Sequence, residues 1–324
     1  GSVGEEGLAA DEIDDAQATA ARGLSPDGKT LYWLDSRGRD TAALVAEDFG
    51  SGRTQVLGQD ARADVGGVLA HPRTGVVQAW SAEYLRETWN ALDPAVAQDL
   101  EFLRGRLEGE IDVTSRTLAD DAWLVVVDPV NGPAATWRYD RAAQKLTKLF
   151  VNRPELVGAP LAPMQPLELT SRDGKTLVSY LTLPPGSDAN GDGRPERPVP
   201  MVLLVHGGPW ARDSYGYDGE VQWLANRGYA VLQVNFRGST GFGKAFISAG
   251  DRAWAREMHD DLLDAVEWAV KNGVAPRDRV AIMGGSYGGY ATLAGLTFTP
   301  KTFACGVSIV GPSNLQTLLD SVPP

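Results

Sequence analysis

The stretch Gly284-Gly285-Ser286-Tyr287-Gly288-Gly289-Tyr290 decides the fold of the second half of this chain. It follows directly after the apolar run 280–283, which is short enough to be a buried β-strand, and leads into residues 287–297, which we expect to form a helix. Glycines at positions 284 and 288 allow neighbouring backbone to pass close to a sharp turn between strand and helix. A serine on such a turn projects its hydroxyl outward, so the stretch predicts a nucleophile at Ser286.

The spacing G-x-S-x-G in this context is typical of the nucleophile elbow of an α/β-hydrolase. A serine hydroxyl is a poor nucleophile unless a base removes its proton and hydrogen-bond donors stabilise the oxyanion that forms. The N–H of Tyr287 lies at the start of the expected helix, where unpaired donors and the helix dipole favour negative charge. In a glycine-rich chain this pattern alone is weak support for an enzyme.

A second motif, His206-Gly207-Gly208-Pro209, follows the apolar run 201–205. Lipases and esterases have a glycine loop of this type after a buried strand, where it supplies the other N–H of the oxyanion hole. The strand, the loop and the elbow occur in the order that this fold requires. Together they predict a serine hydrolase.

Strands and helices alternate from about residue 165 onward. Residues 167–183 are expected to form a hairpin around an Asp-Gly turn, and the apolar runs 230–236 and 306–310 predict further buried strands. Residues 253–272 have apolar side chains at helical spacing, and Gly273 stands where a C-terminal cap belongs. The alternation predicts a doubly wound, mostly parallel sheet in a domain of residues 161–324.

Residues 1–160 are predicted to form an all-β domain with an internal repeat. A turn that leads into a strand recurs at residues 24–34, 69–80 and 118–127, with outer hairpins at 43–57 and 136–150. A period of roughly 45 residues with four short strands per unit is typical of β-propeller blades. The sequence therefore predicts part of a propeller, with about three blades.

One helix is expected within this β pattern. Asp93-Pro94 supplies an N-cap and a first-turn proline, and apolar residues recur at helical spacing over residues 95–107. Glu83, Arg86 and Glu87 precede this helix. They are either solvated surface charges, which is the favoured interpretation, or contacts for the terminus of a substrate.

The three histidines of the chain all precede Ser286, whereas an α/β-hydrolase orders its triad as Ser, then Asp or Glu, then His. His206 is expected to orient the oxyanion loop or to pack locally. His259 lies within an expected helix, and His71 lies in a turn between strands. We therefore expect the triad Asp and His to lie outside this chain, which would then be an inactive part of a longer enzyme, truncated at its C-terminus.

Composition limits the other functions. The apolar content of 43% is enough for a core in each of two domains. The formal net charge is −12 and no basic patch is visible, which argues against a nucleic-acid binder. No apolar run approaches the roughly 18 residues of a membrane helix. Cys305 is the single cysteine, so an intrachain disulfide is excluded, and both a cytoplasmic and a periplasmic location are compatible with the sequence.

The segment 188–193 is similar to the start of a calcium loop, but Val199 stands where a bidentate glutamate would be needed. A solvated, turn-forming loop is the favoured interpretation. The sequence accordingly predicts neither a metal nor a cofactor.

Four motifs together resemble the prolyl oligopeptidase family of serine peptidases, over about residues 160–324. The motifs are the elbow, the His206–Pro209 loop, Asn235-Phe-Arg-Gly-Ser-Thr-Gly-Phe-Gly-Lys244 and Gly311-Pro-Ser-Asn314. The propeller-like first half agrees with the resemblance, because this family carries an N-terminal β-propeller. The H-G-G-P form is similar to the acylaminoacyl-peptidase-like and bacterial oligopeptidase branches.

The resemblance implies that Ser286 is the acylated nucleophile and that the N–H groups of Tyr287 and Gly208 form the oxyanion hole. It also implies a propeller that admits only short or unstructured peptides as substrates. Members of the family have more blades, and more sequence after the serine, than this chain. An incomplete chain is therefore the expectation.

Two other interpretations stay open. A carboxylesterase is the alternative enzyme, since the elbow determines acyl transfer and not the acyl group. A non-catalytic binding protein built on a degenerate hydrolase is the third, although the intact elbow and glycine loop count against it. The oligomeric state is not indicated by the sequence.

Overall fold

The computed structural model describes residues 15 and 18–321, and the chain divides into two compact units. Unit 1 comprises Gly1–Val127, Ala135–Val151 and Thr240–Ser248. Unit 2 comprises Asp128–Ala134, Asn152–Ser239 and Ala249–Pro324. The division into domains of residues 1–160 and 161–324 stays a prediction.

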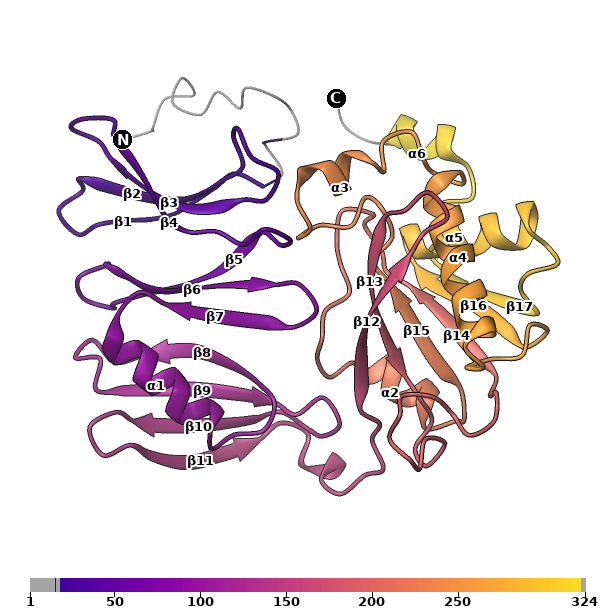
Figure 1. Cartoon of the computed structure of the whole chain (residues 1–324), viewed down its shortest axis with the longest axis horizontal. Helices are drawn as coiled ribbons and strands as arrows, with labels where there is room; N and C mark the ends of the chain where they lie inside the picture. The colour runs from indigo at the N-terminus through magenta and orange to yellow at the C-terminus, as the bar shows by residue number, and fades with distance from the viewer. Residues whose placement is uncertain (1–14, 16–17, 322–324) are drawn as a thin grey trace. The chain divides into compact units, whose positions relative to one another are not determined.

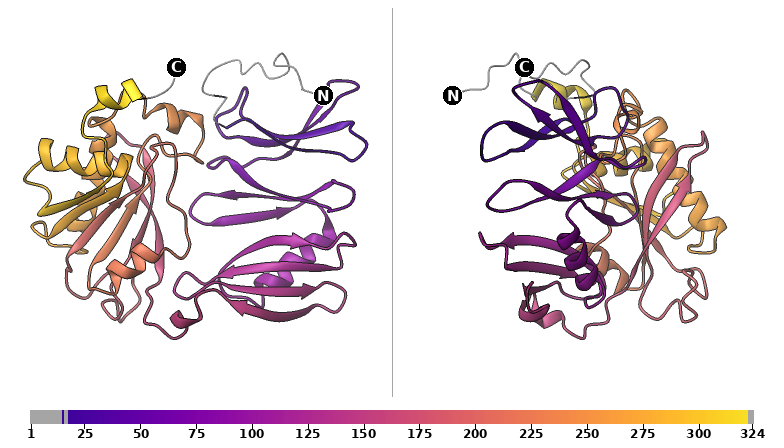
Figure 2. Two further views of the ribbon diagram at one scale, coloured as in Figure 1. Left: turned by 180° about the vertical axis from the view of Figure 1, so that it is seen from behind. Right: turned by 60° about the vertical axis from the view of Figure 1, so that its left-hand side comes forward.

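The described residues of unit 1 form three antiparallel sheets, which follow one another along the chain (Figure 1). The first sheet has four strands in sequential order: β1 (Ala20–Leu24), β2 (Thr30–Asp35), β3 (Ala43–Asp48) and β4 (Thr54–Gly58). The second has three: β5 (Val65–Ala70), β6 (Val77–Glu83) and β7 (Glu87–Ala91). The third has four: β8 (Glu110–Arg116), β9 (Ala122–Asp128), β10 (Ala135–Asp140) and β11 (Lys145–Val151). Both views in Figure 2 show these sheets stacked in chain order, as the repeat predicts.

Helix α1 (Pro94–Arg104) connects the second sheet to the third and supplies much of the core of unit 1. Asp93 caps it by accepting a hydrogen bond from the Ala95 N–H at 2.8 Å, with Pro94 in the first turn, as predicted. Its buried face, which includes Leu103, packs in a cluster with Trp123 and Tyr139 of the third sheet. The helix ends at Arg104, before the predicted residue 107.

Unit 2 is built on a six-stranded sheet in the order β12-β13-β15-β14-β16-β17. Only the hairpin at one edge is antiparallel to its neighbours; β14, β15, β16 and β17 run parallel to one another. The strands are β12 (Met164–Thr170), β13 (Thr176–Thr182), β14 (Met201–Val205), β15 (Ala230–Val234), β16 (Val280–Gly285) and β17 (Cys305–Ile309). The predicted mostly parallel sheet is therefore present. The ends of its parallel strands lie within two residues of those expected, and β12 begins three residues before the expected start of the hairpin at residue 167.

Helices cover both faces of this sheet. Side chains of a strand alternate between its two faces, and β14 and β15 are buried at every position, so both faces need a cover. Helix α2 (Gly219–Ala225) packs against Val202, Leu204 and Met283. Helix α5 (Tyr287–Phe298) packs on the opposite face, where a Cβ on its Gly295 would lie 3.4 Å from Ile282 Cδ1. The other helices of the described residues are α4 (Glu257–Lys271), α6 (Leu315–Ser321) and the 3₁₀ turn Pro154–Leu156 in unit 2, and α3 (Lys244–Ser248) in unit 1.

The predicted start of α4 at residue 253 is wrong. Arg252 and Ala255 have φ angles of +57° and +58°, and an α-helix cannot pass through that region of backbone space. The helix therefore begins at Glu257 and ends, as expected, before Gly273, whose φ of +74° suits the C-terminal cap. Within the described part of the chain, none of the helices has the length and apolar character needed to cross a membrane.

Candidate active site

Ser286 lies at the turn between β16 and α5 and is exposed. Its backbone angles, φ 55° and ψ −117°, are unusual for a residue other than glycine and cost about 1–3 kcal/mol. Two hydrogen bonds hold the turn: the Ser286 N–H donates to Ile309 O at 2.9 Å, and the Tyr290 N–H donates to Ser286 O at 3.0 Å. The surrounding backbone thus maintains the strained conformation that exposes the hydroxyl.

The elbow requires glycine at two positions because backbone passes within contact distance of them. A Cβ on Gly284 would lie 2.5 Å from Val205 O, and a Cβ on Gly288 would lie 2.0 Å from the same oxygen. Both distances are shorter than any van der Waals contact. The two glycines therefore let α5 approach the end of β14, as the sequence predicts.

The His206–Pro209 loop follows β14 and lies beside Ser286. A Cβ on Gly207 would lie 3.5 Å from Ser286 Cβ and 3.3 Å from Gly285 O. Gly208 has a φ of +114°, and a Cβ there would lie 2.6 Å from Trp210 N, so this position also requires glycine. The structure therefore brings together the loop, the elbow and the N-terminus of α5.

The His206 ring is hydrogen-bonded to Gly207 of this loop and to Ser239, which follows β15, and not to Ser286. Its Nδ1 lies 2.7 Å from Gly207 O, and its Nε2 lies 2.9 Å from Ser239 Oγ. The ring also stacks on Phe236, with centroids 4.4 Å apart. Burial lowers the pKa of His206 to about 4, so the imidazole is neutral at pH 7. These contacts fit a residue that holds the glycine loop in place.

The other two histidines have partners elsewhere. His259 is buried in α4, where its Nε2 lies 2.9 Å from Thr299 Oγ1, and burial lowers its pKa. His71 lies in a turn of unit 1, where its Nδ1 accepts hydrogen bonds from the N–H groups of Arg73 and Thr74. Among the residues that the structure describes, no histidine is bonded to Ser286.

An aromatic cluster packs around the first turn of α5. The Tyr287 ring lies 5.2 Å from Phe236 and 4.7 Å from Trp254, between centroids, and Trp254 also contacts Tyr290 at 5.1 Å. Burial raises the pKa of the Tyr287 phenol, which therefore stays protonated. The packing of the Tyr287 ring thus holds the backbone of this residue, including its N–H group, in place. Trp254 was not identified from the sequence because the expected helix placed it on a different element.

Arg237 is a second residue that the sequence did not single out. It donates hydrogen bonds to the Asp261 carboxylate of α4 and to Asp173 of the β12–β13 turn, at 2.6 and 2.8 Å from its Nη2. These hydrogen bonds hold the pKa of Asp173 well below its usual range. Arg237 therefore ties the segment after β15, which carries His206's partner Ser239, to two other elements of unit 2.

The charged residues before α1 are not all solvated, contrary to the favoured interpretation. Glu87 accepts hydrogen bonds from Ser81 Oγ at 2.7 Å and from Trp89 Nε1 at 3.0 Å, and burial raises its pKa. Arg86 is exposed, and its Nε donates to Glu110 at 2.7 Å. Glu87 is therefore a half-buried member of unit 1.

The calcium-like segment forms a turn through its own side chains. Asp188 Oδ2 accepts a hydrogen bond from the Gly193 N–H at 2.9 Å, and Asn190 Oδ1 accepts one from the Asp192 N–H at 3.2 Å. Within the described ranges, no group of three or more His, Cys, Asp or Glu side chains is arranged to hold a metal ion.

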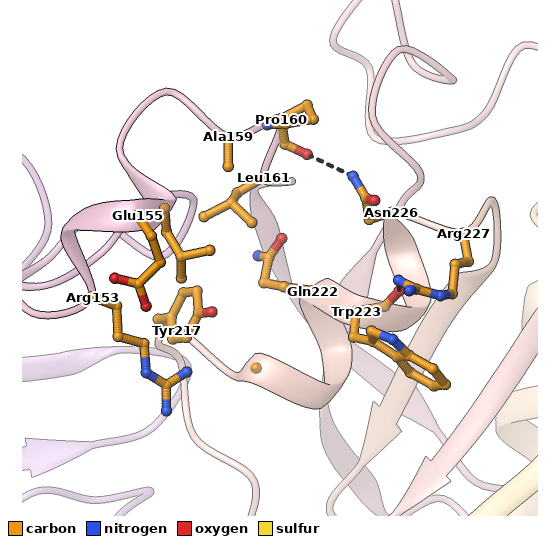
Figure 3. Close-up of a pocket in the computed structure, with 12 residues that line it drawn as sticks. Arg153, Glu155, Ala159, Pro160, Leu161, Tyr217, Gln222, Trp223, Asn226 and Arg227 are labelled. Carbon is orange, nitrogen blue, oxygen red and sulfur yellow. Dashed lines mark hydrogen bonds between the residues drawn. The ribbon is translucent and has the colours of Figure 1, made fainter.

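Unit 2 also has an open cavity of about 490 Å³ beside α2 (Figure 3). Its walls include Arg153 and Glu155 at one end, and Trp223 and Arg227 at the other, where the guanidinium lies 4.5 Å from the indole centroid. Its lining residues include neither Ser286 nor the glycine loop.

Comparison with known proteins supplies an independent view of this site. A sequence model of the prolyl oligopeptidase family matches residues 215–321. The chain is 63% identical over 312 residues to dipeptidyl aminopeptidase BIII of Pseudoxanthomonas mexicana. The aligned region covers 96% of this chain and 45% of that protein. It is 40% identical to dipeptidyl peptidase family member 6 of Caenorhabditis elegans, and that alignment covers 96% of this chain and 44% of the relative. The chain thus spans about half the length of the curated relatives it matches.

A solved structure of a puromycin-hydrolyzing peptidase of Mycobacterium tuberculosis has a TM-score of 0.71 with this chain at 24% identity, covering 94% of this chain and 47% of that one. At this identity the likeness concerns the fold alone. Together with the three blade-like sheets and the mixed sheet, it confirms the predicted fold class: part of a propeller followed by an α/β-hydrolase sheet.

Proposed function

Because the chain belongs to the prolyl oligopeptidase family, we propose that Ser286 is the nucleophile of a serine peptidase and is acylated by short peptides. The observation that carries this proposal is the geometry of the elbow. Ser286 is exposed, in a strained conformation, and next to a glycine loop that places further backbone beside it. A serine in a merely structural turn would not require this combination.

In the proposed reaction Ser286 Oγ attacks the scissile carbonyl carbon, and the carbonyl oxygen takes up negative charge. The N–H groups of Tyr287 and Gly208 are the donors assigned to that oxyanion. Tyr287 is the first residue of α5, where unpaired N–H groups and the helix dipole favour an anion. When the oxyanion collapses, the C–N bond breaks and the amine leaves with the proton that the base took from Ser286 Oγ. Water then attacks the acyl-enzyme with its proton passing to the base, the acid product is released and the Ser286 hydroxyl is restored.

A base must remove the proton from Ser286 Oγ, and all three histidines of the chain have other partners. The proposal therefore assigns the base, and the aspartate that orients it, to sequence not included in residues 1–324. By itself this chain is expected to react slowly. Loss of the histidine from a Ser-His-Asp enzyme costs on the order of 10⁶ in kcat.

The substrate is proposed from the relatives. Two relatives at 63% and 40% identity are named as dipeptidyl peptidases, which supports release of dipeptides from the amino terminus of a peptide. An esterase with the same elbow is the alternative.

Substrate comparison tests this proposal in a protein extended to the length of those relatives. We expect hydrolysis of a dipeptidyl anilide, little hydrolysis of its N-acetylated form, and loss of activity in Ser286→Ala. Ser115→Ala, which removes an exposed hydroxyl in β8, is the control and should retain activity. Cleavage of short-chain esters without cleavage of any peptide amide would contradict the peptidase assignment.

A further inference from the structure

Asp213, which lies between the glycine loop and α2, attaches this part of the chain to the end of β15. The Asp213 N–H donates to Asn235 Oδ1 at 2.8 Å, and Asn235 Nδ2 donates back to Asp213 O at 3.1 Å. Gln233 Nε2 donates to Asp213 Oδ1 at 3.0 Å. The main chain and the side chain of Asp213 are therefore both attached to β15, on the route from the glycine loop to α2.

Two buried oxygen atoms at this anchor accept no hydrogen bond from the described residues: Asp213 Oδ2 and Gln233 Oε1. Leaving a buried acceptor unpaired costs about 1–3 kcal/mol. An ionised carboxylate has acceptors only, so it cannot satisfy the glutamine oxygen, whereas a carboxylic acid has one O–H donor. A single proton on Asp213 Oδ2 satisfies both atoms, if the O–H donates to Gln233 Oε1 while Gln233 Nε2 donates to Asp213 Oδ1.

We propose that Asp213 is protonated in the folded protein and forms a cyclic acid–amide pair with Gln233, which positions the glycine loop beside Ser286. Asp213 and Gln233 are then positioning residues, since neither contacts the reacting atoms. The protonation is independent of the function proposed above. Only the consequence for the reaction rests on it.

The surroundings of the carboxyl group agree with the neutral form. Burial is the main cause that raises the pKa of Asp213 to about 7. The hydrogen bond from Gln233 and the Arg212 guanidinium oppose this shift, and the Asp218 carboxylate adds to it. Arg212 directs its Nε to Asp213 O at 3.2 Å and its Nη2 to the Tyr180 hydroxyl at 3.3 Å. Tyr180 is the residue of β13 paired with Gln233. The donor to Asp213 Oδ1 is the neutral amide of Gln233.

The pair makes the loop sensitive to pH in a defined direction. Below a pH of about 4 the carboxyl is protonated in both the folded and the unfolded chain. Between about 4 and 7 the folded chain binds more protons, so this residue's contribution to stability falls as the pH rises, and it is constant above that range. Ionisation removes the O–H and leaves Asp213 Oδ2 and Gln233 Oε1 as two buried acceptors without a donor.

Infrared spectroscopy of the 324-residue chain tests the protonation directly. Asp213→Asn replaces the acid by an amide that can pair with Gln233 in the same geometry but cannot titrate. The wild type at pH 6 should show a protonated carboxyl band that is absent from Asp213→Asn and disappears with a midpoint near pH 7. Asp278→Asn, which removes an exposed carboxylate before β16, is the matched control and should keep the band. Gln233→Met should shift the band to the frequency of an unpaired acid.

The absence of any such band at pH 6 in a folded wild type would overturn the proposal, and would indicate an ionised Asp213 with a buried water bridging the two oxygens. Thermal unfolding gives the second measurement. The melting temperature of the wild type relative to Asp213→Asn should fall between pH 5 and pH 8, and a constant difference would also contradict the pair.

In the extended enzyme, the ratio of wild-type to Asp213→Asn activity should fall severalfold as the pH passes through 7, in kcat more than in KM. If the band is found but Ser286 proves unreactive, the proposed function fails while the acid–amide pair stands. If the band is found and the activity ratio stays constant, the pair does not position the loop.

Discussion

At the scale of single residues, Ser286 combines exposure with a backbone conformation that costs free energy. A φ of 55° with a ψ of −117° is easy for glycine and unfavourable for serine. The hydrogen bond to Ile309 O and the close approach of Gly288 to Val205 O hold the residue there. The strain therefore lowers the stability of the protein at the position where the proposed nucleophile is exposed.

Replacing this serine by glycine should make the chain more stable. We expect Ser286→Gly to raise the free energy of unfolding by about 1 kcal/mol, because the strain disappears while the hydroxyl, which is exposed, contributes little. Urea unfolding measures the change. Ser286→Ala keeps the strain and is the matched control, with an expected change below about 0.5 kcal/mol. Equal stability of the two variants would show that the turn stores no strain.

His206 should stay neutral throughout the range in which an ordinary histidine titrates. Because burial lowers its pKa to about 4, its ring NMR signals should not move between pH 8 and pH 5.5. The signals can be assigned by their absence from His206→Gln. Folding stability that depends on the neutral ring is present above the ordinary pKa of 6.5 and is lost as the pH falls toward 4. A midpoint near 6.5 would contradict the bonded, buried position described for this residue.

At the scale of elements, α1 shows what packing adds to local sequence signals. Its N-cap at Asp93 and its first-turn proline were predicted from two residues, and the structure confirms both. Its packing between the second and third sheets depends on Trp123 and Tyr139, which belong to strands that follow the helix in the sequence. Spacing along one helix cannot indicate that partnership.

The buried face of α1 should be the part that stabilises unit 1. Leu103→Ala removes a fully buried side chain and should lower the free energy of unfolding by about 2–5 kcal/mol. Leu118→Ala, at a side chain that is 69% exposed, is the control and should change it by less than about 0.5 kcal/mol. A loss below 1 kcal/mol for Leu103→Ala would show that α1 is not part of the cooperative core.

The sequence indicated the strands and most of the site, and the misses have physical causes. Apolar runs predicted the parallel strands, and glycine spacing predicted the elbow and the loop, since close backbone approach leaves glycine as the sole option there. The start of α4 was missed because Arg252 and Ala255 have positive φ angles, which the spacing of apolar residues does not indicate. Asp213 and Gln233 were missed because their pairing joins a loop to a strand that periodicity does not connect.

At the scale of the whole molecule, the chain contains the elbow and the glycine loop, and it spans about half the length of its relatives. Unit 2 holds both motifs on the ends of neighbouring parallel strands, β14 and β16. The three histidines are bonded to other groups. We therefore propose that Ser286 and the glycine loop supply a nucleophile and an oxyanion site, and that the base comes from sequence outside residues 1–324.

Labelling with a fluorophosphonate, with the modified residue identified by mass spectrometry, tests this claim most directly. We predict that Ser286 is the labelled residue, once per chain, in a protein extended to the length of the relatives, and that the 324-residue chain reacts slowly or not at all. Absence of label from Ser286 in a well-folded extended protein would contradict its assignment as nucleophile. Fast, stoichiometric labelling of the 324-residue chain would contradict the assignment of the base to further sequence.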